Sequence, residues 1–271
     1  MVRDITLGQF FPGNSILHRM DPRMKIILML TLIIFIFITF NFFALGLVVA
    51  TVVVIVGCSG VPVKLFLKSL KAVIFILLFT SVLNLFYGSG TALWHWGFLS
   101  ITLAGIYFAI FISIRIIELI FISSSLTFTT QPTDLTDAIE RLLKPLNHLH
   151  ISVHEIAMMM TIALRFIPTL LEETDKIMSA QKARGADMES GNIVQRIKAM
   201  IPVLVPLFVS AFRRAYELAM AMECRCYRGG EGRTRMKQLH YSKVDFYCLG
   251  AVLIIVSGVI LCNIFLPAVM R

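Results

Sequence analysis

Two arginines flanked by small residues are the side chains of this sequence best placed to bind a partner. They lie in the tripeptides Ala183-Arg184-Gly185 and Cys224-Arg225-Cys226. Each tripeptide ends a long stretch with the apolar repeat of a helix, so each guanidinium is expected on a last helical turn. A guanidinium offers a planar pair of donors to a carboxylate. Cations also offset the helix dipole at C-termini, which explains either tripeptide alone, but two copies favour a docking function.

Other polar residues give weaker indications of chemistry. Arg115 and Glu118 are three residues apart in an apolar stretch, so they share a helix face and can pair locally. Charges inside a membrane are functional candidates, but we interpret this pair as structural or partner-facing, toward the cytoplasmic side. Three histidines, His148, His150 and His154, lie close together. They are better explained as a polar loop and helix start than as metal ligands, so we expect no metal site.

The elements that must position these residues are mostly apolar. Of the 271 residues, 58% are hydrophobic and 15% are charged, and the mean hydropathy is +0.84. Soluble domains are typically about 45–50% apolar and about 25% charged. Residues 131–243 hold 16 of the 25 Lys and Arg and 12 of the 16 Asp and Glu. An all-α membrane protein with one polar segment is therefore predicted. The net charge of +9 is typical of membrane topology, and no nucleic-acid-binding motif accompanies it.

Five transmembrane helices are expected. Residues 26–57 contain no charge and exceed the roughly 20 residues of one span, so we interpret them as two spans with a turn at Asn41. The remaining spans are predicted at residues 71–87, 98–122 and 244–266. The domains that follow are an N-terminal segment at 1–25, four spans within 26–130, a polar domain at 131–243, and a last span with the C-terminus at 244–271.

The distribution of basic residues indicates the orientation, because Lys and Arg favour cytoplasmic loops. Basic residues precede the first predicted span and separate the second from the third: Arg19, Arg23, Lys25, Lys64, Lys68 and Lys71. The turn at Asn41 and the loop at 88–97 contain no Lys or Arg. We therefore expect a multi-pass protein of the cell membrane, with its N-terminus and residues 131–243 in the cytoplasm.

The polar segment 131–243 is predicted to form one short and two long helices. These are expected at residues 134–143, 152–185 and 192–227. Ser152 and Glu155 have the spacing of a capping box, and Pro168 should bend the first long helix. The uncharged run 199–212 in the second long helix has only 14 residues. Because this is short for a span, we expect both long helices to lie along or just below the membrane.

Four motifs follow one another along the chain. They are Asp21-Pro22-Arg23-Met24-Lys25, Leu164-Arg165-Phe166-Ile167-Pro168, Ala180-Gln181-Lys182-Ala183-Arg184-Gly185 and Ala221-Met222-Glu223-Cys224-Arg225-Cys226-Tyr227. In order and spacing they resemble the transmembrane T component of energy-coupling factor transporters, the EcfT/CbiQ family. The resemblance covers essentially the whole chain. One departure is that the second arginine motif usually has Ala and Gly or Ala where this chain has Cys224 and Cys226. Cysteine is also small, so docking should survive.

The resemblance implies a coupling function within an importer. Two cytoplasmic ABC-type ATPases would dock through Arg184 and Arg225, and a membrane S component would bind the vitamin or metal ion. ATP-driven movement of the two long helices, the coupling helices, would reorient the S component and release the substrate inside. In this picture residues 131–243 are a cytoplasmic coupling domain, and Arg165 and Pro168 are partner-facing or structural residues.

The sequence itself indicates that ATP is bound by another chain. It contains no GxxxxGK[ST] motif, and residues 229–232 lack the lysine and hydroxyl of a phosphate-binding loop. We therefore expect neither an enzyme nor a cofactor in this chain. A stand-alone secondary transporter, the main alternative, predicts internal repeats and broken, charged spans, and no repeat is seen. An intramembrane enzyme needs a cluster of His, Glu or Asp, whereas Glu118 is the only acidic residue in the predicted spans apart from Asp245 at the edge of the last one.

Overall fold

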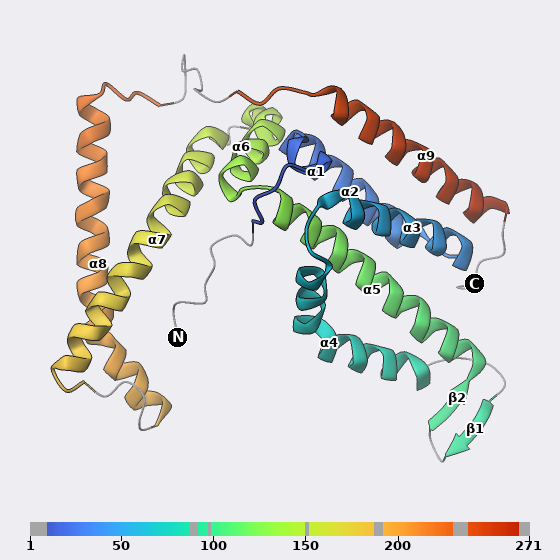
Figure 1. Cartoon of the computed structure of the whole chain (residues 1–271). Coiled ribbons are helices and arrows are strands. Elements are labelled where there is room, and N and C mark those ends of the chain that lie inside the picture. Colours follow the sequence, from blue (N-terminus) through green and yellow to red (C-terminus); the bar gives the residue numbers. More distant parts are fainter. Residues whose placement is uncertain are drawn as a thin grey trace. The chain divides into compact units, whose positions relative to one another are not determined.

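The computed structural model describes residues 10–86, 92–96, 99–149, 152–186, 192–229 and 238–265. The chain divides into two compact units (Figure 1). Of the described residues, the first contains 10–135 and 238–265, and we call it the membrane unit. The second consists of residues 136–237. Since it carries Arg184 and Arg225, we call it the arginine unit.

The membrane unit is helical apart from one hairpin. Its described elements are α1 (Ile16–Arg19), α2 (Pro22–Ile38), α3 (Phe42–Ser59), α4 (Val63–Phe86), β1 (Ala92–Trp96), β2 (Leu99–Thr102), α5 (Leu103–Thr129) and α9 (Lys243–Phe265). Helix α3 is rich in β-branched valine, which ordinarily favours strands. In lipid, however, every backbone polar group needs an internal partner, and a helix supplies one within a single segment.

Helix α5 organises the packing of the membrane unit. It contacts α2, α3 and α4, while α9 contacts α2 and α3. The buried core joins four helices through apolar side chains such as Ile36 of α2, Val48 of α3, Ile122 of α5 and Val259 of α9. Where α4 meets α5, a Cβ added to Gly105 would lie 2.5 Å from a backbone oxygen of α4. Only glycine permits this close approach.

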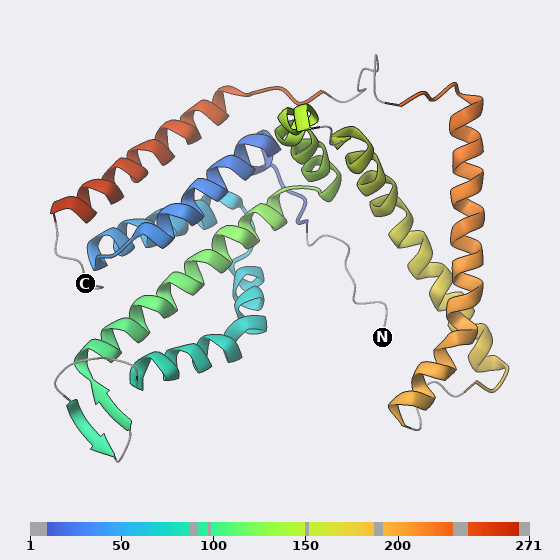
Figure 2. The same ribbon diagram turned by 180° about the vertical axis from the view of Figure 1, so that it is seen from behind.

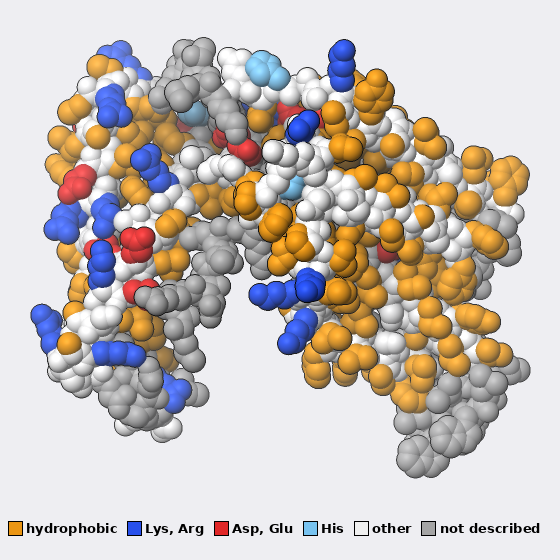
Figure 3. Space-filling view, in the orientation of Figure 1, with side chains coloured by type: hydrophobic (Ala, Val, Ile, Leu, Met, Phe, Trp, Pro, Cys, Tyr) orange, Lys and Arg blue, Asp and Glu red, His pale blue; other side chains and the backbone are white. Residues whose placement is uncertain are grey.

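Helices long and apolar enough to cross a membrane are found in both units. Among the described residues there are six: α3, α4, α5, α7, α8 and α9. Helix α2 is also apolar but has 17 residues. Large apolar side chains are exposed along α4, including Phe75 at 79% and Phe79 at 59%. Figure 3 shows hydrophobic side chains over much of the visible face of the membrane unit, as lipid contact requires.

Two expectations about the membrane unit need correction. Helix α4 begins at Val63, so Lys64, Lys68 and Lys71 lie inside a helix and not in the loop predicted before it. Lysine is a good helix former whose long stem lets the ammonium reach water from a helix. The antiparallel hairpin of β1 and β2 was also not expected, because residues 88–97 were interpreted as a loop and 98–122 as a span.

The arginine unit contains the predicted short helix and the two long ones. Helix α6 (Pro132–Leu143) begins in the membrane unit, and the 3-10 helix η1 (Lys144–Leu149), α7 (Val153–Ala183) and α8 (Ile193–Cys224) follow. The capping box expected at Ser152 is not formed, since its side chain makes no cap hydrogen bond. A capping box is found instead at the start of α8, between Asn192 and Gln195. The position of α7 and α8 relative to a membrane stays a prediction.

Candidate docking site

Both candidate docking arginines lie at the position that closes a helix. Arg184 is the C-terminal cap of α7, and Gly185 follows it in the left-handed conformation, with φ of 84°. The N–H of Gly185 donates to the carbonyl oxygen of Lys182 at 3.0 Å, and the N–H of Ala186 donates to that of Gln181 at 3.0 Å. These two bonds form a Schellman motif, which satisfies the last carbonyl groups of the helix.

The end of α8 repeats this geometry. Arg225 is the C-terminal cap, and Cys226 follows in the left-handed conformation, with φ of 56°. The N–H of Cys226 donates to the carbonyl oxygen of Glu223 at 2.9 Å, and the N–H of Tyr227 donates to that of Met222 at 3.0 Å. Both arginines are exposed. The backbone therefore presents the two guanidinium groups in the same way, at the ends of two different helices.

The shared geometry gives a physical account of the residue that follows each arginine. A left-handed residue costs about 1–2 kcal/mol unless it is glycine. Gly185 avoids this cost, whereas Cys226 bears it as the sole non-glycine residue with positive φ in the described part of the chain. Sequence reasoning noted only that Cys226 is small. It did not predict a Schellman motif there, because cysteine has no preference for the left-handed region.

Helices α7 and α8 run antiparallel, which places the two arginines at opposite ends of the pair (Figures 1 and 2). At one end, the amide of Gln181 donates to the carbonyl oxygen of Pro202 at 3.3 Å. At the other, the hydroxyl of Tyr227 donates to the sulfur of Met158 at 3.0 Å. At about 1.5 Å per residue, the stretch of α7 from Met158 to Arg184 spans roughly 39 Å. One small contact surface on a partner therefore cannot cover both arginines.

A polar contact holds the two helices together between these ends. The hydroxyl of Ser210 donates to Oε1 of Glu173 at 2.5 Å, and Nη2 of Arg214 donates to Oε2 of the same carboxylate at 2.8 Å. The side chain of Glu173 is 21% exposed and that of Arg214 is 36% exposed. Sequence reasoning did not identify these residues. Charged residues among apolar ones on two neighbouring helices were the sequence feature that could have indicated this contact.

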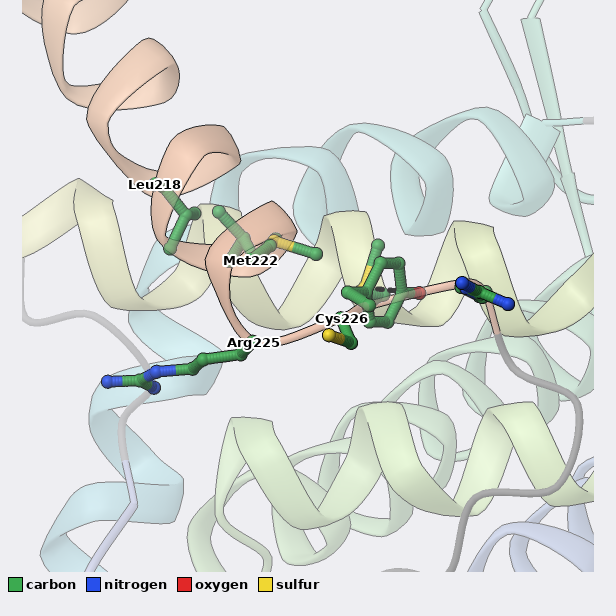
Figure 4. Close-up of a pocket in the computed structure, with 9 residues that line it drawn as sticks. Leu218, Met222, Arg225 and Cys226 are labelled. Atoms are coloured by element: carbon green, nitrogen blue, oxygen red, sulfur yellow. Dashed lines mark hydrogen bonds between the residues drawn. The ribbon is translucent and has the colours of Figure 1, made fainter.

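A cavity of about 400 Å³ lies beside Arg225 (Figure 4). Its walls include the apolar side chains Met158, Ile162, Leu218 and Met222. Arg225, Tyr227 and Arg228 also line it. Figure 4 shows the side chain of Arg225 extending away from Met222 and Cys226. The end of α8 thus offers a partner an exposed cation beside an apolar recess.

Arg115 and Glu118 are not brought together as an ion pair. Nη2 of Arg115 donates to the carbonyl oxygen of Thr39 at 2.5 Å, and its guanidinium lies 4.9 Å from the ring centre of Phe111. Glu118 is 2% exposed, and neither carboxylate oxygen has a hydrogen-bond partner in the described structure. Thr39 lies in the turn before Asn41, which was predicted to be external. This contact does not fit the expectation that Arg115 points toward the cytoplasmic side, and both placements relative to the membrane stay predictions.

The remaining predicted site residues lie on α7 and around the histidines. Arg165 and Pro168 are both exposed, and α7 continues through Pro168. Their partner-facing role stays a prediction. Nδ1 of His154 lies 3.1 Å from Oε1 of Glu140, which joins the start of α7 to α6. His150 lies outside the described residues.

Comparison with known proteins addresses the resemblance directly. A family model described as cobalt transport protein, CbiQ, matches residues 13–236. A protein of Ruminiclostridium cellulolyticum named energy-coupling factor transporter transmembrane protein EcfT is 56% identical over 264 residues, covering 96% of this chain and 98% of that protein. The chain belongs to the CbiQ/EcfT family. Two further relatives have the same name. The protein from Clostridium kluyveri is 49% identical, covering 98% of this chain and 99% of that protein. The protein from Bacillus subtilis is 46% identical, covering 90% of this chain and 93% of that protein.

Membership of the CbiQ/EcfT family confirms the resemblance stated from the four motifs. It makes the chain a multi-pass membrane component of a transporter and not itself a catalytic enzyme. Membership also implies that the chain works in a complex with other components. The all-α membrane fold is confirmed as well, with the hairpin of β1 and β2 as its departure in the described residues.

Proposed function

We propose that this chain couples two ABC-type ATPases to a substrate-binding S component in an importer of the energy-coupling factor type. The observation that carries the proposal is the pair of exposed, Schellman-capped arginines at opposite ends of α7 and α8. Because Arg184 and Arg225 are presented alike but lie far apart, they suit two similar docking surfaces. A pair of related ATPase chains would provide two such surfaces.

Each arginine would engage a carboxylate or backbone carbonyl groups on one ATPase. Arginine keeps its charge and carries a rigid fork of donors, so it can form two bonds at once. At Arg225, the adjoining apolar recess would also accept a hydrophobic side chain of the partner. ATP would be bound and hydrolysed by the ATPase chains, and this chain would hold no cofactor of its own.

The S component would pack on the uncovered apolar side of α8. Large side chains recur there at helical spacing and are widely exposed, including Ile201 at 50%, Phe208 at 62% and Phe212 at 72%. An apolar surface of this kind on a helix with charged ends is typical of a protein or membrane interface. The S component would supply the specificity for a vitamin or a metal ion.

Movement of α7 and α8 would link the two kinds of partner. The N-terminus and the arginine unit would lie in the cytoplasm, since the ATPases are there and Lys and Arg gather on α7 and α8 (Figure 3). Nucleotide-driven closure of the ATPases would then change the distance between the two arginine-capped helix ends. The S component on α8 would follow that change.

Capture of ATPases by the tagged chain tests the proposal. The chain would be co-expressed with its candidate ATPases, and the amount retained in detergent would be compared for wild type, Arg184→Ala, Arg225→Ala and the double variant. Arg213→Ala is the matched control, because Arg213 is an exposed arginine in the middle of α8, away from both arginine-capped helix ends. We expect reduced capture for each single variant, none for the double variant, and wild-type capture for the control.

Two results would contradict the proposal. The wild-type chain would capture no ATPase, or the double variant would capture as much as Arg213→Ala. Either result would return a stand-alone secondary transporter to consideration.

A further inference from the structure

The arginine unit is joined to the membrane unit by two chain connections. The first leaves the end of α5, passing through Thr129 and Thr130 into α6, and the second re-enters α9 through residues 239–242. On the membrane-unit side, both connections are held by the first residues of one helix, α2. The contacts involved all lie within the membrane unit.

Lys25 holds the first connection. It is 6% exposed, and its Nζ donates to the carbonyl oxygen of Thr129 at 2.9 Å and to Oγ1 of Thr130 at 3.1 Å. A buried ammonium is costly unless its protons are used in hydrogen bonds. Here it lies at the C-terminus of α5, where the helix dipole also favours a cation. The point from which the chain leaves for α6 is therefore fixed to α2.

Asp245 ties the start of α9 to the start of α2. It is 1% exposed, and its two carboxylate oxygens have different partners. Oδ1 accepts from the backbone N–H of Asp21 at 2.9 Å, and Oδ2 accepts from the backbone N–H of Ser242 at 2.7 Å. Since the contact with Asp21 is buried, losing this carboxylate would leave the backbone N–H of Asp21 unsatisfied.

Arg23 holds the second connection. Its Nη2 donates to the carbonyl oxygen of Leu239 at 2.9 Å, and its guanidinium lies 4.5 Å from the ring centre of Tyr241. The same guanidinium donates from Nε and Nη2 to the two carboxylate oxygens of Asp21, at 3.2 and 2.9 Å. Its planar fork thus binds the carboxylate of Asp21 through two nitrogens and the returning chain at the same time.

We infer that Asp21, Arg23, Lys25 and Asp245 form a relay that passes movement of the arginine unit to the membrane helices, and we name this set the α2 junction. A connection anchored by buried hydrogen bonds transmits a displacement, whereas a free connection would absorb it. Both connections converge on the first turn of one helix, so a displacement of either reaches α2. The inference rests on the proposed coupling function, and these are positioning residues.

Hydrogen–deuterium exchange of the chain in nanodiscs with its captured ATPases tests the relay. Exchange would be compared without nucleotide and with ATP plus orthovanadate. The variants are Lys25→Met and Arg23→Gln, and the controls are Lys71→Met and Arg19→Gln, which remove the same charges from exposed positions. In wild type and controls we expect nucleotide to change exchange in α7, α8 and both connections, at residues 125–135 and 238–250. Lys25→Met loses the response of residues 125–135 and Arg23→Gln that of residues 238–250, while the response of α7 and α8 remains.

The outcomes separate the relay from the coupling function. If wild type captures no ATPase, the proposed function fails. If ATPases bind and α7 responds, but each variant keeps the wild-type response of the connection that its residue holds, the relay is refuted and the coupling function stands. A wild-type response confined to α7 and α8 also refutes the relay. If Lys25→Met does not fold, Arg23→Gln alone decides, because Arg23 lies closer to the surface and its loss leaves Lys25 in place.

Discussion

Gly185→Ala should loosen the end of α7 that carries Arg184. An added Cβ meets no atom within 4 Å in the described structure, so the cost comes from the backbone alone. Because φ is 84° at this position, alanine should destabilise the closed helix end by about 1–2 kcal/mol. The opening equilibrium of the last turn should therefore rise by a factor of about 5–30.

Cys226→Gly should have the opposite effect at the end of α8. Glycine removes the left-handed cost of about 1–2 kcal/mol, and it adds about 0.4–1 kcal/mol of conformational freedom to the unfolded chain. The expected net gain is about 1 kcal/mol, or roughly a fivefold decrease in opening. Because Cys226 is exposed, little packing is lost.

Hydrogen–deuterium exchange measured by mass spectrometry in nanodiscs checks both changes. The relevant amides are those of residues 185–186 and 226–227, which donate the Schellman hydrogen bonds. Gly46→Ala is the matched control, since its added Cβ also meets no atom but Gly46 lies inside α3 without a positive φ. That control should leave both helix ends unchanged. Unchanged exchange after Gly185→Ala, or faster exchange after Cys226→Gly, would refute the reasoning.

Three further predictions concern stability, measured as thermal unfolding in detergent. Glu173→Gln and Arg214→Gln should show a coupling energy of about 0.5–1 kcal/mol in a double-mutant cycle, because the pair is partly exposed; additive effects would contradict this. Gly105→Ala should cost about 1–3 kcal/mol, since its Cβ would meet the backbone of α4; an unchanged melting temperature would contradict this. Arg115→Met should cost about 1.5–3 kcal/mol, as it breaks a charged hydrogen bond. Glu118→Gln should leave stability almost unchanged, because that carboxylate has no partner in the described structure. A larger loss of stability for Glu118→Gln than for Arg115→Met would contradict this.

Features set by local chemistry were predictable from the sequence. Long apolar stretches indicated the membrane helices, since their length and hydropathy determine whether a helix can cross lipid. Small residues around Arg184 and Arg225 indicated helix ends, and both arginines are indeed the caps of α7 and α8. The family resemblance depended on the order of four short motifs, and the comparisons confirm it.

Features set by packing were not predictable in the same way. The start of α4 was predicted too late, at residue 71, because lysines were assumed to mark a loop. Lys64 and Lys68 instead belong to the helix. The local pairing of Arg115 with Glu118 was plausible from spacing alone. Only the fold shows that a carbonyl oxygen of the α2–α3 turn accepts a hydrogen bond from the arginine instead. The contacts of Lys25 join residues more than 100 positions apart, and no local pattern indicates such a contact.

Site-specific photo-cross-linking tests most directly whether the two arginine ends dock two ATPase chains. A photoreactive residue would replace Ala183, Cys224 or both, since both positions are exposed beside an arginine. Glu172, exposed near the middle of α7 and far from both arginine ends, would serve as the control position. We predict one attached ATPase chain from either single position, two from the double replacement, and none from the control. No adduct at either position, or a single attached chain when both carry the cross-linker, would contradict the proposed docking.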